Sequence, residues 1–189
     1  MHASFIRVWD PGIRIFHWAL VGSFSLAWLS PSVEPDLHVV AGYTLLGLIA
    51  FRTVWGVVGS RHARFADFVH SPSRIVHYLR AVLGGNAERY LGHNPAGGAM
   101  VLTLLLSLAV LALTGVAVLG AFEAAGPLRF LFDAMGDDGA HLLRWLHELF
   151  VDVVIGLIAL HLLGVFGTSI QHGENLLRAM ITGNKPRRL

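Results

Sequence analysis

Residues 99–121 read AMVLTLLLSLAVLALTGVAVLGA, an apolar run without a single charged side chain. A bilayer core is about 30 Å thick, and a helix needs roughly 20 mostly apolar residues to cross it. The run therefore predicts a membrane-spanning helix. Outward from it, similar apolar segments predict spans at about residues 13–29, 38–58, 96–121 and 145–170. We expect residues 1–189 to form a single all-α integral membrane domain, a four-transmembrane-helix bundle that runs up, down, up and down.

The composition excludes several classes of protein. Of the 189 residues, 54% are hydrophobic and only 14% are charged, and the mean hydropathy is +0.62. A soluble domain carries about 25% charged residues, so a soluble enzyme or a disordered chain does not fit. There is no cysteine. That excludes disulfides, iron–sulfur ligation, thiolate zinc sites and covalent haem attachment.

Basic residues divide the predicted loops into two groups. Cytoplasmic loops are rich in Arg and Lys. One group holds most of these: Arg7, Arg14, Arg61, Arg64, Arg74, Arg80, Arg89, Arg178, Lys185, Arg187 and Arg188. The other holds only Arg129 and Arg144, beside Glu34, Asp36, Glu123, Asp133, Asp137 and Asp138. This bias predicts a multi-pass membrane protein with both termini cytoplasmic. The cytoplasmic loop 59–94 is expected to lie as amphipathic segments against lipid head groups, and no nucleic-acid partner is expected.

Histidine inside the spans is the main functional signal. Ionisable side chains are rare within membrane segments and are a functional hypothesis by default. Four qualify: His17, His38, His147 and His161. The last two are 14 residues apart, which is about 21 Å of helix and returns to nearly the same face. With alternating spans, His38 and His147 share the outer depth, and His17 and His161 share the inner depth.

Histidines paired at one depth suit a haem held by two axial imidazoles. We therefore expect two b haems, one held by the pair His17/His161 and one by His38/His147. Gly42, one turn after His38, would leave room for the flat ring. Arg52 either neutralises a haem propionate or caps the cytoplasmic end of its span. A single histidine could instead only bond a neighbouring helix, and His93 and the other loop histidines are weaker candidates.

The order and spacing of several short strings resemble the bacterial cytochrome b561 family, over about residues 7–185. The strings are Val8-Trp9-Asp10, Arg14-Ile15-Phe16-His17-Trp18, Leu37-His38-Val39-Val40-Ala41-Gly42-Tyr43, Phe51-Arg52-Thr53-Val54-Trp55-Gly56, Gly92-His93-Asn94-Pro95-Ala96-Gly97, Leu146-His147-Glu148, Glu174-Asn175-Leu176 and Met180-Ile181-Thr182-Gly183. They are more similar to the branch of nickel-hydrogenase b-type cytochrome subunits. The resemblance implies a four-helix membrane bundle with two b haems and the same four histidine ligands.

The resemblance also implies electron transfer between the quinone pool, as ubiquinone or menaquinone, and a periplasmic redox protein. That partner would be a cytochrome c or a hydrogenase-like protein. The chain would then be an electron-transfer subunit or a quinone-linked oxidoreductase of a respiratory chain in the bacterial inner membrane.

Two alternatives remain at this point. Some relatives oxidise superoxide and reduce ubiquinone, but the acidic outer loops would repel an anionic substrate. A non-redox histidine-bearing transporter would need carboxylates along its path, and only Glu148 and Asp152 are available. Haem stoichiometry separates the transporter from the cytochromes, and superoxide-driven quinone reduction separates the two redox functions.

Overall fold

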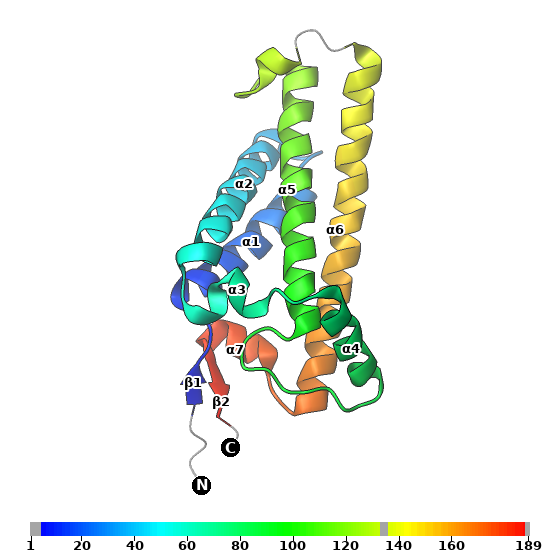
Figure 1. Cartoon of the computed structure of the whole chain (residues 1–189). Helices are drawn as coiled ribbons and strands as arrows, with labels where there is room; N and C mark the ends of the chain where they lie inside the picture. Colours follow the sequence, from blue (N-terminus) through cyan, green and yellow to red (C-terminus); the bar gives the residue numbers. More distant parts are fainter. Residues whose placement is uncertain (1–4, 133–135, 188–189) are drawn as a thin grey trace. The chain divides into compact units, whose positions relative to one another are not determined.

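The computed structural model describes residues 5–132 and 136–187 and is helical except for one pair of short strands (Figure 1). Four of its helices are long and apolar enough to cross a membrane, as the sequence predicted. They are α1 (Pro11–Leu29), α2 (Pro35–Val58), α5 (Pro95–Glu123) and α6 (Asp137–His172). The short elements are β1 (Phe5–Arg7), η1 (Arg61–Ala63), α3 (Phe65–Phe68), α4 (Pro72–Leu83), η2 (Arg129–Leu131), α7 (Leu176–Thr182) and β2 (Asn184–Pro186).

Proline and a capping side chain set where the long helices begin. Proline is the first residue of α1, α2 and α5, where its missing N–H and fixed φ suit a helix start. Asp10 Oδ1 accepts the Ile13 amide at 3.0 Å, and Asn94 Oδ1 accepts the Gly97 amide at 2.7 Å. These bonds satisfy amide groups that have no partner inside the helix.

Helix α6 starts earlier than the apolar segment that was expected to begin near residue 145. Its first turn contains Asp137 and Asp138, whose charges favour a helix N-terminus. A hydropathy argument does not detect such polar turns because it finds only the part of a helix that suits hydrocarbon.

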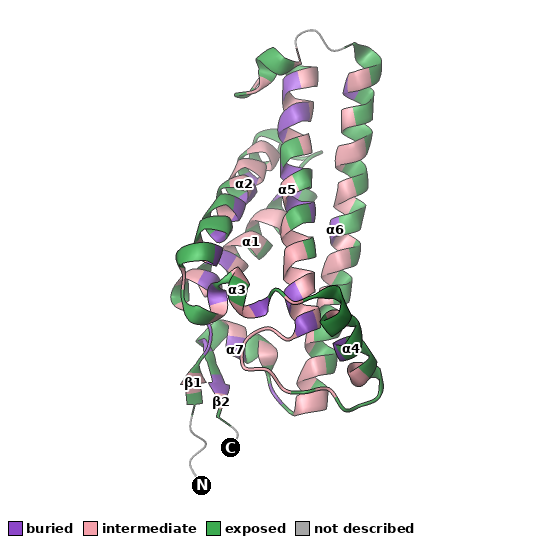
Figure 2. Ribbon diagram, viewed as in Figure 1, coloured by how far each residue is buried: buried purple, intermediate pink, exposed green. Residues whose placement is uncertain are grey.

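The long helices leave much of their apolar surface uncovered, as the green and pink stretches of Figure 2 show. Examples are Leu106, 68% exposed, Leu163, 69% exposed, and Ile170, 82% exposed. A helix that is apolar on all sides is typical of a membrane span, since lipid covers the outward side chains. The exposed leucines are therefore the lipid-facing surface that a membrane protein requires.

Contacts divide the chain into two compact units, which are described separately. Unit 1 consists of Met1–Ala19, Ala50–Thr103 and Ile158–Leu189. Its core cluster combines Val8, Trp9, Ile13, Ala63 and Ala179, with Trp55 packed against it. Unit 1 therefore joins the two ends of the chain to the segment between α2 and α5.

The two ends of the described chain are held together inside unit 1. Strand β1 pairs antiparallel with β2, with Ile6 opposite Lys185. Gly183, at φ +84°, ends α7, and a Cβ there would lie 2.6 Å from the Trp9 carbonyl oxygen. Only glycine suits that conformation and that close approach.

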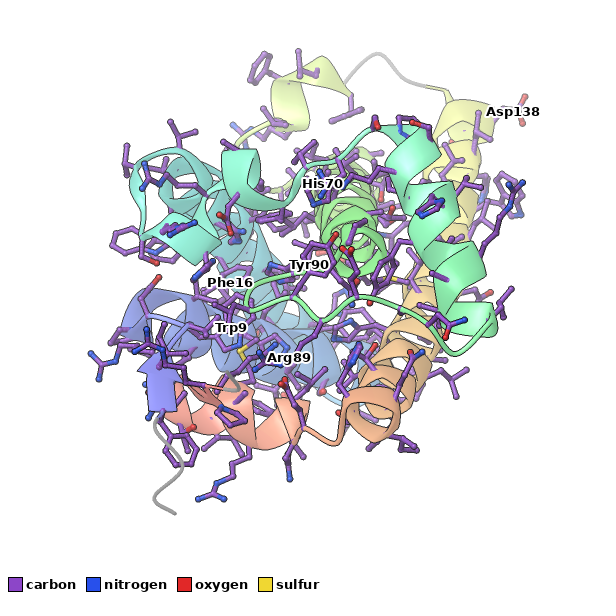
Figure 3. All side chains as sticks on the ribbon, turned by 60° about the horizontal axis from the view of Figure 1, so that its bottom comes forward. Trp9, Phe16, His70, Arg89, Tyr90 and Asp138 are labelled. Carbon is purple, nitrogen blue, oxygen red and sulfur yellow. The ribbon has the colours of Figure 1, made fainter. Side chains whose placement is uncertain are left out.

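An ion-pair cluster, labelled in part in Figure 3, ties β2 to the segment before α5. Glu174 pairs with Arg89 and lies 3.6 Å from Lys185 Nζ. Lys185 Nζ also donates to the Tyr90 carbonyl at 3.2 Å, and Arg89 Nη2 donates to the Pro186 carbonyl at 2.7 Å. Burial lowers the pKa of Lys185, while the Glu174 carboxylate opposes that change.

Helix α4, in the same unit, has a mixed surface. Tyr78 is buried, whereas Val76, Leu79 and Leu83 are exposed beside the exposed basic residues of the helix. Exposed apolar side chains with neighbouring arginines suit a helix at a lipid–water interface.

Unit 2 consists of Leu20–Ile49 and Leu104–Leu157. Its core cluster is Ala27, Ala41 and Leu45, with Leu20 and Phe24 packed against it. Small residues such as Ala27 and Ala41 allow close helix packing within a membrane, where burial from water does not drive association.

Candidate functional site

His38 and His147, predicted as a ligand pair, meet in unit 2. Their ring centres are 6.2 Å apart and their planes are nearly perpendicular, at 85°. The Nδ1–H of His38 donates to the Ala27 carbonyl at 2.7 Å, and that of His147 donates to the Leu111 carbonyl at 3.1 Å. A carbonyl only accepts, so each Nδ1 carries the proton and each Nε2 keeps its lone pair.

The His147 ring packs closely against helix α5. Thr114 Oγ1 lies 3.2 Å from His147 Nδ1. A Cβ placed on Gly115 would lie 3.0 Å from Cε1 of the same ring. The glycine therefore lets the imidazole pack directly against the helix backbone.

A pocket adjoins both histidines within unit 2. Its lining is almost entirely apolar: Phe24, Ala27, Trp28, His38, Val39, Gly42, Tyr43, Leu45, Leu111, Ala112, Gly115, Val116, Leu119, His147 and Val151. Gly42 lines this pocket, and a Cβ there would meet no atom within 4 Å. An apolar lining with a few polar groups is typical of cofactor pockets.

These features fit a haem. A metal bonded to two opposed imidazoles, at about 2.0–2.1 Å from each nitrogen, requires ring centres about 6 Å apart. The separation of His38 and His147 meets that requirement. The Tyr43 hydroxyl is buried in the pocket lining without a hydrogen-bond partner, so it is available to form a hydrogen bond with a bound group.

The second predicted pair, His17 and His161, lies in unit 1. Among the described residues, no ring contact of the kind that joins His38 and His147 links these two histidines. His17 Nδ1 is buried without a hydrogen-bond partner, and the ring meets Trp18 edge-on at 5.1 Å. Ring nitrogens that could serve as axial ligands are thus present in unit 1, but this site is less completely formed than the site of His38 and His147.

Arg52, the predicted propionate or cap residue, is also in unit 1. It is only 2% exposed, and its Nη1 atom has no hydrogen-bond partner. Its Cζ lies 4.8 Å from the ring centre of Phe65 and 5.8 Å from that of Phe68. A buried guanidinium with an unused donor fits an anion better than it fits the end of a helix.

Sequence reasoning ranked His93 among the weaker histidines, yet the structure places it in the interior of unit 1. Its ring lies 4.7 Å from both the Trp9 and the Phe68 ring centres, and its Nδ1 is buried without a partner. Burial, together with the positive charges of Arg52 and Lys185, lowers the pKa of His93 to about 3. The imidazole is therefore neutral near pH 7. Only its position just before the Asn94 cap could have suggested this burial.

Two other histidines have contacts of their own. His62 Nδ1 lies 2.8 Å from Asp67 Oδ2. His141 is exposed on α6 and meets the Phe122 ring edge-on at 5.6 Å.

A comparison with protein-family models matches residues 8–183 to the model described as prokaryotic cytochrome b561. The chain belongs to the prokaryotic cytochrome b561 family. Cytochromes b561 are membrane proteins that bind b-type haem and transfer electrons, which agrees with the apolar helices and with the histidine pair of unit 2. The resemblance found in the sequence is thus confirmed at the level of the family. Neither the curated proteins nor the solved structures gave a match.

Proposed function

We propose that this cytochrome b561 holds two b haems and transfers electrons between the quinone pool and a redox protein on the periplasmic side. His38 and His147 would be the axial ligands of one haem, and His17 and His161 those of the other. The proposal is carried by the close approach of the His38 and His147 rings, in which the hydrogen bonds use Nδ1 and leave Nε2 available on each ring.

A bound haem supplies one-electron chemistry, because its iron alternates between two oxidation states. The residues of unit 2 orient and insulate it. The carbonyl groups of Ala27 and Leu111 fix the tautomer and direction of the two imidazoles. Gly42 and Gly115 add no side chain to the pocket, and most of the remaining pocket wall is apolar. Because imidazole would fill both axial positions, no site is left for an added ligand.

Arg52 would bind a propionate of the haem between His17 and His161. Its burial and its unpartnered Nη1 support this role over helix capping. A charge-assisted bond to a carboxylate is strong where water is excluded. The positive charge of Arg52 would also raise the midpoint potential of that haem.

The acidic loops favour a basic redox partner, such as a cytochrome c. Asp137 and Asp138 are exposed at the start of α6, and Asp133 lies outside the described residues. Assignment to the nickel-hydrogenase branch would make the partner a hydrogenase-like protein. The quinone would be ubiquinone or menaquinone, and the positive-inside bias favours cytoplasmic termini.

Purified full-length protein tests the proposal. A reduced-minus-oxidised spectrum with a pyridine haemochrome assay should count two haems per chain. Quinol should then reduce the haems, and cytochrome c should reoxidise them. Superoxide-driven quinone reduction without cytochrome c exchange would favour the superoxide oxidase alternative. A haem-free protein would overturn both redox functions and leave the transporter.

A further inference from the structure

The charge of Arg52 needs an anion that the described chain does not provide. Among residues 5–132 and 136–187, Arg52 makes no ion pair. Its contacts with the rings of Phe65 and Phe68 stabilise the cation but leave Nη1 without an acceptor. Burying a charge without a counter-ion is costly. An external anion would relieve that cost.

The acidic residues whose charges act on this region already have partners. Asp10 accepts bonds from Ser60, Trp55 and the Ile13 amide, Asp67 pairs with His62, and Glu174 pairs with Arg89 and Lys185. Recruiting any of them to Arg52 would break an existing contact. The anion is therefore expected to come from outside the protein chain.

His93 offers a second unused polar atom beside Arg52. Its ring is fixed between Trp9 and Phe68, and its Nδ1 is buried without a partner. Phe68 is fully buried and contacts both His93 and the Arg52 guanidinium. His93 and Arg52, each with one nitrogen atom that lacks a hydrogen-bond partner, therefore both lie beside Phe68 in the interior of unit 1.

We propose that His93 and Arg52 bind one carboxylate together, a propionate of the haem held by His17 and His161. The Nδ1–H of neutral His93 donates to one oxygen, and Arg52 Nη1 supplies the charge. His17 and His161 belong to the same compact unit as His93 and Arg52. This assignment rests on the proposed function and makes His93 a cofactor-binding residue rather than a packing residue.

Full-length protein loaded with both haems provides the test, with His93→Leu and His93→Gln compared with the parent. His77→Leu is the matched control because His77 is exposed on α4. We expect His93→Leu to keep two haems and to lower one midpoint potential, since a less neutralised carboxylate favours the ferric state. The expected change in the reduction equilibrium is roughly three- to tenfold, and tenfold corresponds to about 59 mV for one electron. The glutamine variant and the control should stay near the parent.

The propionate-bending band of the resonance Raman spectrum reports the bond itself. It should shift in His93→Leu and return in His93→Gln, a change that loss of packing alone would not produce. The shift in potential of Arg52→Leu/His93→Leu should be smaller than the sum of the single shifts, because both groups serve one carboxylate.

Several outcomes would overturn the inference while leaving the proposed function intact. One is a His93→Leu variant with parental potential and parental band. Another is strict additivity in the double variant. If His93→Leu loses the haem, the glutamine variant decides between the two readings. Loss of the haem in His93→Gln as well would count against the hydrogen bond, whereas a His93→Gln protein with its haem and the parental band would support the hydrogen bond. A parent protein with fewer than two haems would instead overturn the proposed function.

Discussion

The ring of His147 lies so close to α5 that a Cβ on Gly115 would be 3.0 Å from its Cε1 atom. Cβ contacts of that length are rare, so a side chain at this position requires the imidazole to shift slightly. The carbonyl of Leu111, one turn earlier on α5, accepts the ring Nδ1–H at 3.1 Å. The absence of a side chain at Gly115 and the direction of the histidine are therefore parts of one arrangement.

Gly115→Val should remove one haem and leave the other, because a branched side chain pushes His147 away from its acceptor carbonyl. The measurement is haem per chain in the purified variant. Gly22→Val is a matched control, since a Cβ at Gly22 would meet no atom within 4 Å. A variant at position 115 with two haems and a parental spectrum would contradict the role of this contact.

Gly42→Leu should exclude the same haem by filling the pocket without clashing with the protein. Nothing lies within 4 Å of a Cβ at Gly42, so the new side chain would occupy the space between the pocket walls. Gly47→Leu on the same helix is the control, because Gly47 is exposed, does not line the pocket and has equally open space. Thermal unfolding should show both variants folded. Equal haem content in both would place the haem elsewhere.

His38→Ala and His147→Ala should abolish the same spectral component, and His17→Ala and His161→Ala should abolish the other. Two imidazoles on each iron also predict low-spin spectra and slow reaction with carbon monoxide in the reduced parent protein. Loss of one common component from His17→Ala and His147→Ala would show that the pairing is wrong. Rapid carbon monoxide binding would indicate an open axial position.

Asp10→Ala should destabilise the start of α1 by about 1 kcal/mol, because it removes the acceptor of the Ile13 amide. Burial raises the pKa of Asp10, but bonds from Ser60, Ile13 and Trp55 outweigh it, so the net pKa lies below 3.8. A depressed carboxyl pKa stabilises the fold above the unfolded value, and this stability is lost as the pH falls through the folded value.

Thermal unfolding in detergent between pH 7 and pH 3 measures this effect. The difference between the parent and Asp10→Ala should shrink below about pH 4. Asp10→Asn should retain most of the cap and lose the pH dependence, since asparagine caps as well as aspartate. A difference that grew on acidification would contradict the assignment.

Asp137→Asn/Asp138→Asn should slow electron exchange with a basic cytochrome c at low salt and flatten its salt dependence. Both carboxylates are exposed, so their attraction for a basic partner is screened as ionic strength rises. Glu88→Gln, an exposed acid in the predicted cytoplasmic loop, is the control. If the variant exchanges electrons with cytochrome c as fast as the parent does at low salt, the start of α6 is not part of the docking surface.

The sequence by itself determined the four membrane helices and the four candidate ligands. Hydrocarbon thickness fixes how long an apolar run must be, and the helical repeat puts His147 and His161 on one face, so both are local properties. The early start of α6 at Asp137 was missed, because a charged first turn resembles a loop on a hydropathy scale.

Only the tertiary structure decided which atoms meet. The carbonyls that orient His38 and His147 lie on a different helix from the histidine that each one binds. No sequence pattern marks them. His93 gains its neighbours from Trp9 and Phe68, which are distant along the chain. Such contacts depend on how helices pack, because burial and hydrogen-bond partners are properties of the assembled chain rather than of any segment.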